Sequence, residues 1–133
     1  AMIQLIDSDI IEILWAMAEN RVDEIRLERS DLCSVAVVLA SEGYPMDIRT
    51  GIEIKGITNV FLEHVGDSPI VFCGALRDEG GRAVTTGGRN ITVVGLGKNL
   101  QIANQAAYSL IKGKAFEHLW YRDDIGNDYI ITE

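Results

Sequence analysis

The feature that most limits the fold of this chain is the apolar run LCSVAVVLA at residues 32–40. The run is rich in valine, is too short for a typical helix, and stops at the Gly- and Pro-containing segment SEGYP. Uninterrupted runs of β-branched residues are typical of a strand inside a sheet. We therefore predict a central strand at 32–40 that is buried on both faces.

Other segments are expected to supply the neighbouring strands. Alternating charged and apolar residues at 24–28 predict a half-exposed strand, and GIEIKG at 51–56 predicts a short one. Segments 69–76 and 83–86 flank the turn sequence RDEGGR and are expected to form a hairpin. After an interruption by TGGR, the sequence NITVVGL at 90–96 predicts the last strand.

Two helices are expected around this sheet. The first runs from Asp9 to Asn20 with Asp9 as its N-cap, and the second begins after the N-cap Asn99 and ends at Gly113 as its C′ residue. Hairpins with so few helices favour an α+β fold, a mainly antiparallel sheet with flanking helices, over a doubly wound parallel sheet. The apolar faces are formed by Ile10, Ile11, Leu14, Trp15 and Met17 in the first helix, and by Leu100, Ala103, Ala107 and Leu110 in the second.

Size and charge limit the possible partners. The 133 residues correspond to one domain or to part of a larger protein. With 12 Lys and Arg against 20 Asp and Glu, the net charge is -8, so we expect no nucleic acid and no anionic membrane as a partner. The sequence shows no apolar stretch long enough to span a membrane and no secretory signal. We expect reduced cysteines and a cytoplasmic location.

The sequence shows no self-contained catalytic set. His64 and His118 lack Cys or carboxylate neighbours at the spacing of a zinc site, and neither cysteine lies in a nucleophile motif. The segment GLGK at 95–98 lacks the spacing of a phosphate-binding loop. We therefore predict no catalytic residue and no metal ligand in this chain.

The segment TGGR at 86–89 is the first candidate for ligand binding. Gly87 and Gly88 allow backbone N–H groups to converge on an anion, and Arg89 offers a planar fork that matches phosphate oxygens. The alternative is a bend in the sheet whose arginine forms a surface salt bridge.

The segment YRDDIG at 121–126 is the second candidate. Its adjacent carboxylates, Asp123 and Asp124, are suitable ligands for Mg²⁺. The alternative is an exposed charged turn in which Arg122 pairs locally.

Four motifs occur in a fixed order along nearly the whole chain. They are Ser-Asp-Ile before the first helix, VVLASEGYP with the later Gly51 and IKG, TTGGR with the later Val93 and Gly97, and YRDDIG. Together they resemble the C-terminal region of the phosphoribosylamine–glycine ligases, which are also called glycinamide ribonucleotide synthetases and are ATP-grasp enzymes.

The resemblance implies a division of labour within a larger enzyme. Residues 1–22 would be the terminal helix of the ATP-grasp domain, and residues 23–133 the C-terminal substrate-side domain. The family joins glycine to phosphoribosylamine through a glycyl phosphate, with ATP and Mg²⁺ or Mn²⁺ bound upstream of this region. The expected partner is therefore the ATP-grasp core of a monomeric parent, and the isolated chain is expected to be inactive and to dimerise through its apolar helix face.

The resemblance also implies roles for particular residues. Arg89, with Gly87 and Gly88, would bind the 5′-phosphate of phosphoribosylamine. Two alternatives are another ATP-grasp ligase, such as a carboxylase of the biotin or purine pathway, and a stand-alone, non-catalytic phosphate-binding or interaction module derived from this lobe. Three further residues are expected to be structural or to contact the substrate: Tyr44, Arg122 and Asp124.

Overall fold

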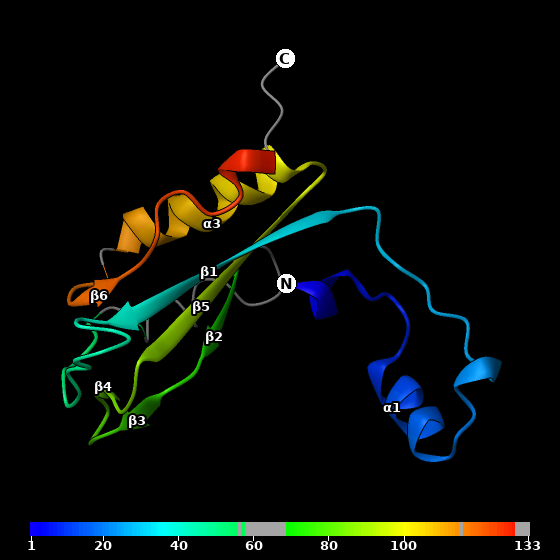
Figure 1. The fold of residues 1–133 in the computed structure, drawn as a ribbon, viewed down its shortest axis with the longest axis horizontal. Helices are drawn as coiled ribbons and strands as arrows, with labels where there is room; N and C mark the ends of the chain where they lie inside the picture. The colour runs from blue at the N-terminus through cyan, green and yellow to red at the C-terminus, as the bar shows by residue number, and fades with distance from the viewer. Residues whose placement is uncertain (56, 58–68, 115, 130–133) are drawn as a thin grey trace.

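The fold is a four-stranded antiparallel sheet covered on one face by a helix (Figure 1). It is described from a computed structural model for residues 1–55, 57, 69–114 and 116–129. The strand order is β2-β5-β1-β6, and β3 and β4 form a separate hairpin, so the predicted α+β class is confirmed. The elements are η1 (Met2–Leu5), α1 (Ile10–Ala18), η2 (Val22–Glu24), β1 (Cys33–Ser41), β2 (Ile70–Cys73), β3 (Leu76–Asp78), β4 (Ala83–Thr85), β5 (Arg89–Gly97), α3 (Leu100–Lys114), β6 (Leu119–Trp120) and η3 (Asn127–Tyr129).

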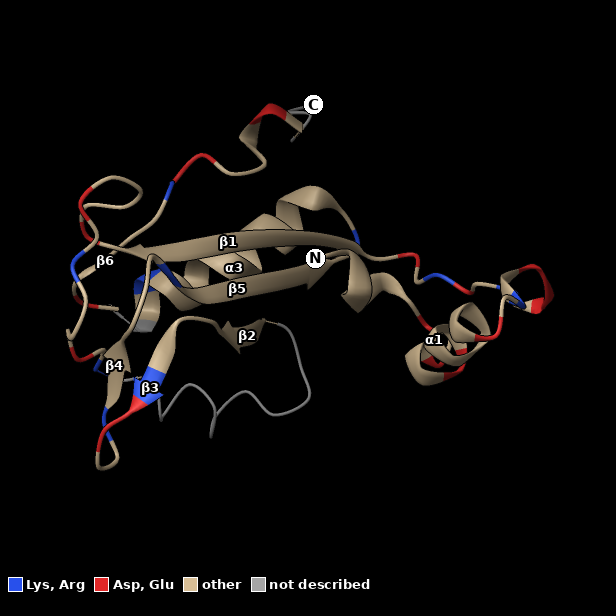
Figure 2. Ribbon diagram, turned by 60° about the horizontal axis from the view of Figure 1, so that its bottom comes forward, with Lys and Arg blue, Asp and Glu red and all other residues tan. Residues whose placement is uncertain are grey.

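The predicted central strand is β1, which pairs with β5 on one side and β6 on the other. It carries no charged residue (Figure 2). Val35, Val37 and Leu39 are buried beneath α3, whereas Val38 on the opposite face is 39% exposed. The expected burial on both faces is therefore wrong, because α3 covers only one face of β1.

Helix α3 lies directly on the backbone of β5. A Cβ atom at Gly95 would be 2.1 Å from the carbonyl oxygen of Ala103 and 2.6 Å from the backbone nitrogen of Ala107. A Cβ atom at Gly97 would be 2.6 Å from the nitrogen of Ala103. Ala103 and Ala107 are fully buried. Small residues on both elements thus allow a close approach of helix and sheet.

The start of α3 agrees with the sequence and its end does not. Asn99 Oδ1 accepts a hydrogen bond from the backbone nitrogen of Ile102 at 2.9 Å, which confirms the predicted N-cap. The helix continues through Gly113 to Lys114, so the predicted stop at Gly113 is wrong. Gly113 does not adopt the left-handed conformation of a C′ residue, and its side of the helix is open.

Helix α1 lies apart from the sheet (Figure 1). The first helix forms with its predicted N-cap, because the side chain of Asp9 accepts a hydrogen bond from the backbone nitrogen of Ile11 at 2.8 Å. It ends at Ala18, before the predicted end at Asn20. The predicted strand at 24–28 is absent from this described segment. The chain there makes the short turn η2 and one bridge, between Ile6 and Arg29. An alternating pattern of apolar and polar residues does not form a strand where no neighbouring strand is available to pair with it.

The remaining strand predictions are confirmed in part. The hairpin β3–β4 forms, but the segment 69–76 divides into β2 and the start of β3. The division falls at Gly74 and Ala75, whose nitrogens donate to the carbonyls of Asn90 and Arg89 and turn the chain from one sheet to the other. The segment at 51–55 is extended and makes one bridge, between Glu53 and Val84, while Gly56 lies outside the described residues.

Among the described residues, no helix is both long and apolar enough to cross a membrane.

The close contact between α3 and β5 gives a first prediction. Gly95→Ala should lower the free energy of unfolding by about 3 kcal/mol, because the new methyl group would overlap the backbone of α3. Gly113→Ala is the matched control, since its position is open and helical, and it should be neutral or stabilise by up to about 1 kcal/mol. Urea unfolding of the variants measures both, and equal effects would contradict the contact.

Candidate functional site

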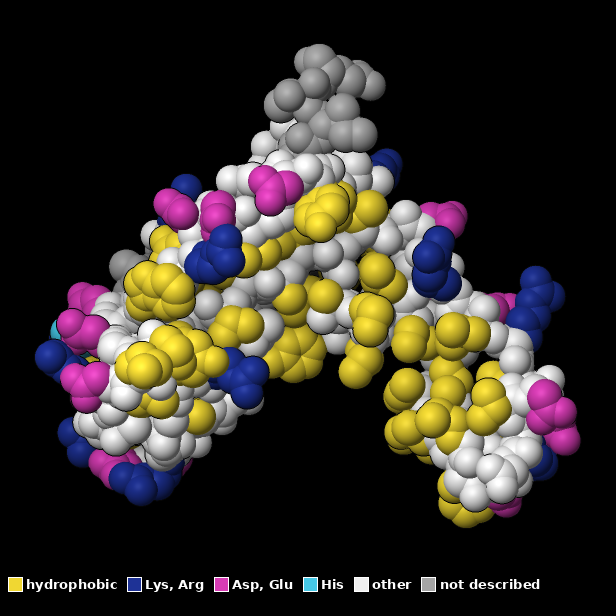
Figure 3. Space-filling model, viewed as in Figure 1, with side chains coloured by type: hydrophobic (Ala, Val, Ile, Leu, Met, Phe, Trp, Pro, Cys, Tyr) yellow, Lys and Arg dark blue, Asp and Glu magenta, His cyan; other side chains and the backbone are white. Residues whose placement is uncertain are grey.

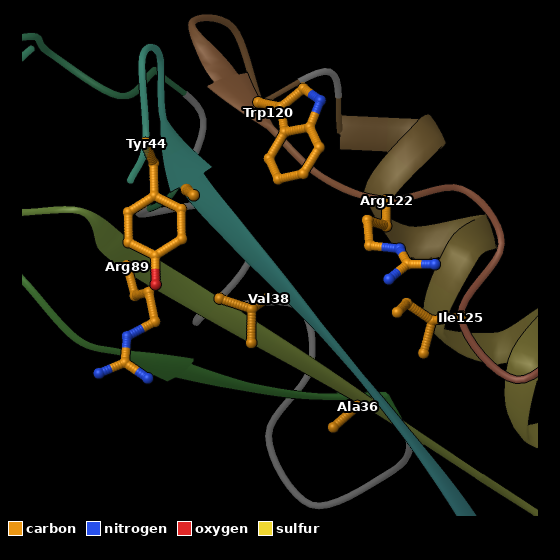
Figure 4. Close-up of a pocket in the computed structure, with 8 residues that line it drawn as sticks. Ala36, Val38, Tyr44, Arg89, Trp120, Arg122 and Ile125 are labelled. Atoms are coloured by element: carbon orange, nitrogen blue, oxygen red, sulfur yellow. The ribbon is translucent and has the colours of Figure 1, made fainter. Parts of the chain in front are cut away.

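A surface pocket lies on the face of β1 opposite α3 (Figure 4). Its volume is about 230 Å³. β1 crosses the middle, with Tyr44 and Arg89 on one side and Trp120, Arg122 and Ile125 on the other. The structure thus brings together three residues that the sequence singled out: Tyr44, Arg89 and Arg122. The floor is formed by Ala36, Val38 and Ala40.

Arg89 is the first residue of β5 and is exposed at the edge of the pocket. Its backbone carbonyl accepts a hydrogen bond from the nitrogen of Ala75 at 3.0 Å. Among the described residues, no carboxylate forms an ion pair with its guanidinium. The charge of Arg89 is therefore available to an anion at the pocket.

A buried polar cluster fixes the segment that leads into Arg89. Asn90 is fully buried; its amide nitrogen donates to the carbonyls of Ala75 (2.8 Å) and Gly87 (3.1 Å). Its oxygen accepts from the backbone nitrogen and hydroxyl of Ser41, at 3.1 and 2.8 Å. The nitrogen of Ser41 also donates to Gly88 O at 2.8 Å. The cluster joins the end of β1 to the start of β5 and leaves Arg89 facing outward.

Gly87 and Gly88 allow close packing in this segment. A Cβ atom at Gly88 would be 2.4 Å from Cδ2 of the Tyr44 ring, and one at Gly87 would be 2.9 Å from the Cβ of Ala75. Neither glycine has a positive φ, so the left-handed step of an anion-binding nest is not formed here. Their contact with a phosphate stays a prediction.

Arg122 differs from Arg89 because it has a local acidic partner. Its Nε and Nη2 atoms donate to the two carboxylate oxygens of Asp124 at 2.8 and 2.6 Å. These hydrogen bonds hold the pKa of Asp124 below its usual range. Both side chains are exposed, so the pair is a surface interaction that orients Arg122 and offsets its charge.

Helix α3 holds the segment that carries this pair. The hydroxyl of Tyr108 donates to the carbonyl of Arg122 at 2.7 Å and accepts from the nitrogen of Ile125 at 3.0 Å. Asn104 Nδ2 donates to the carbonyl of Ile125 at 2.7 Å. Burial raises the pKa of the Tyr108 hydroxyl, which keeps its proton for the bond to Arg122.

Sequence reasoning did not identify five residues that build the site. Four of them act through partners distant in sequence, as with Asn90 and Ser41, or Tyr108 and Ile125. The sequence offered one signal, a polar residue within an apolar segment. This signal is ambiguous, because such a residue is either buried with a hydrogen-bond partner or exposed on the surface. The five residues are Ser41, Asn90, Asn104, Tyr108 and Trp120.

No group of three or more His, Cys, Asp or Glu suitable for a metal ion occurs in the part of the chain that the structure describes. Asp124, one of the two carboxylates considered for Mg²⁺, is bound to Arg122 instead. His64 lies outside the described residues.

Fold and site together define a small α+β domain with an arginine-edged surface pocket. The chain belongs to the family described as phosphoribosylglycinamide synthetase, C domain, which matches residues 34–128.

Relatives of known name support this membership. The chain is 36% identical to the phosphoribosylamine–glycine ligase of Caldanaerobacter subterraneus, over 97% of this chain and 30% of that protein. It is 38% identical to the enzyme of the same name from Caulobacter vibrioides, over 91% of this chain and 28% of the relative. The crystal structure of the Thermotoga maritima phosphoribosylamine–glycine ligase matches 69% of this chain and 21% of its own, with a TM-score of 0.56 and 33% identity. The chain therefore spans about 30% of the length of such relatives.

The hydroxyl of Tyr108 gives a second prediction. Tyr108→Phe should lower the free energy of unfolding by about 1–2 kcal/mol, because it leaves the carbonyl of Arg122 and the nitrogen of Ile125 without their partner. Thermal or urea unfolding measures the loss. Tyr129→Phe removes the same hydroxyl from an exposed ring and should change stability by less than about 0.5 kcal/mol. A loss of equal size in both variants would be inconsistent with the clamp.

Proposed function

We propose that this chain is the C-terminal, substrate-side part of an ATP-dependent ligase that joins glycine to 5-phosphoribosylamine and yields glycinamide ribonucleotide for purine biosynthesis. The observation that carries the proposal is a 36% identity to a phosphoribosylamine–glycine ligase along 97% of this chain. No finding favours a carboxylase or a stand-alone module. The cytoplasmic location expected from the sequence stays a prediction.

Within that enzyme, Arg89 binds the 5′-phosphate of phosphoribosylamine. Its exposed guanidinium has no acidic partner among the described residues and lies at the edge of a pocket. A planar guanidinium forms two parallel, charge-assisted hydrogen bonds with phosphate oxygens. The backbone N–H groups of Gly87 and Gly88 are proposed to contact the same phosphate, while Arg122, already bound to Asp124, lies on the opposite side of the pocket.

The contribution of this chain to the reaction is positioning. A substrate held by its phosphate presents its amine in a defined place, and orientation of two reactants lowers the entropic part of the barrier. ATP and Mg²⁺ or Mn²⁺ are proposed to bind to the ATP-grasp core. The described residues do not fit a metal site, so no chemical step is assigned to them. The isolated chain is accordingly proposed to be inactive.

The apolar face of α1 is proposed to contact that core. Its largest exposed side chain is Trp15, which is 63% exposed, and Ile11 and Leu14 lie on the same exposed helix. Residues at i, i+3 and i+4 share one face of a helix, and apolar side chains gather over α1 in Figure 3. An apolar patch of this kind marks an interaction surface. We propose that the parent enzyme is a monomer in which the patch is covered.

The role of Arg89 gives a third prediction. In the full-length ligase, Arg89→Ala should raise the KM for phosphoribosylamine by about 10–100-fold, the effect of losing charge-assisted hydrogen bonds, and leave the KM for ATP unchanged. Steady-state kinetics with each substrate varied in turn measures both constants. The matched control is Arg77→Ala on β3, which removes an exposed arginine that does not line the pocket. An unchanged KM for the amine would contradict the assignment.

The patch on α1 gives a fourth prediction. The isolated chain should form dimers at micromolar concentration, and Leu14→Glu should shift it to monomers, because a charge in an apolar contact is costly to bury. Sedimentation velocity measures the distribution. Met46→Glu changes an exposed apolar residue far from α1 and should leave the dimers intact. Dimers that persist in the Leu14 variant would show that α1 is not the contact.

A further inference from the structure

Trp120 is a large aromatic side chain that the fold leaves exposed over the pocket. It is 55% exposed, and its backbone pairs with Ala40 at the end of β1. Leu119 and Tyr121, its neighbours in the chain, pack against the core. Because successive side chains of a strand point to opposite faces, Trp120 projects onto the pocket side (Figure 4). An indole in this position lies ready to contact a ligand.

The two sides of the pocket differ in charge. The side of Arg89 carries a cation without an acidic partner among the described residues. On the side of Trp120, the charge of Arg122 is offset by its two hydrogen bonds to Asp124. The floor between them is formed by alanine and valine side chains. A ligand that fits this arrangement has an anionic group at one end and a body with apolar C–H surface at the other.

The size of the pocket is consistent with a small ligand. Its volume of about 230 Å³ is below the ~300–1,000 Å³ typical of sites for drug-sized molecules. A single sugar ring with one phosphate suits this volume.

We propose that Trp120 is the sugar-binding residue of this pocket and that the C–H face of a phosphorylated pentose packs on its indole ring. The inference rests on the proposed function for the position of the phosphate, which is bound by Arg89. Burial of the C–H groups against the indole excludes water from that face of the sugar. The hydroxyl groups on the other face remain toward solvent at the open pocket. Trp120 thus determines specificity for a phosphorylated sugar over free phosphate.

The test uses the intrinsic fluorescence of the chain. Trp15 and Trp120 are its two tryptophans, so Trp15→Phe leaves Trp120 as the only reporter. Ribose 5-phosphate should change the Trp120 emission in a saturable way. Inorganic phosphate should leave the emission unchanged, although calorimetry should show that it binds. Trp120→Ala should raise the Kd for ribose 5-phosphate about tenfold and change the Kd for inorganic phosphate less than twofold, and Trp120→Phe should restore most of the affinity. Tyr129→Ala, the loss of an exposed aromatic side chain that does not line the pocket, should have no effect.

The outcomes separate this inference from the proposed role of Arg89. If ribose 5-phosphate binds through Arg89 with equal Kd in Trp120→Ala, the sugar contact is refuted and the phosphate site stands. If Trp120→Ala weakens both ligands equally, its role is structural and the inference fails. If the isolated chain binds neither ligand, the test is the KM for phosphoribosylamine, measured in the full-length enzyme and in its Trp120 variants. An increase in Trp120→Ala, restored by Trp120→Phe, supports the contact, and no change refutes it.

Discussion

The close contact of α3 with β5 is the constraint on which the rest of this structure depends. Gly95 and Gly97 bring the helix backbone so near the sheet that no Cβ atom fits between them. From this position α3 buries one face of β1, and it also reaches the C-terminal segment through Tyr108 and Asn104. The opposite face of β1 is left partly open, with Val38 39% exposed. The pocket exists because one helix covers one face and anchors the segment that borders the other.

The two arginines of the pocket show how surroundings assign different tasks to one side chain. Arg122 follows β6 and finds Asp124 two residues away, so its charge is used locally. Arg89 begins β5, where a fully buried cluster of Asn90 and Ser41 sets the backbone. A backbone shift here would leave buried polar groups unpaired, which costs free energy. The cluster therefore fixes the backbone position from which the Arg89 side chain extends. A cation without an acidic partner among the described residues is suited to an anionic ligand.

The sequence predicted the elements whose formation depends on local pattern. The strands β1 and β5, the hairpin β3–β4 and the N-caps of both helices follow from apolar runs, turn residues and Asp9 or Asn99. Predictions failed where distant contacts decide. Val38 is exposed because nothing in the described chain covers it, and the segment 24–28 has no strand beside it.

The candidate site was predictable only in part for the same reason. Arg89, Tyr44 and Arg122 stand in sequence motifs, which mark each of them separately. Their meeting in one pocket depends on the pairing of β1 with both β5 and β6. Trp120 belongs to no distinctive pattern. Its exposure follows from the burial of Leu119 and Tyr121 on either side, which is a property of the fold.

The contrast between α1 and α3 bears on the proposed contact of α1 with the ligase core. Helix α3 is supported by the sheet along its length, whereas α1 has nine residues and most of its apolar side chains are exposed. Helices shorter than about 12–15 residues are marginal in water without tertiary contacts, even with an N-cap such as Asp9. We propose that α1 gains its stability from the ligase core proposed above, a surface that the sheet does not provide. A core that covers α1 would also have a defined orientation relative to the pocket on β1. The docking of α1 would then determine from which direction a substrate reaches the pocket.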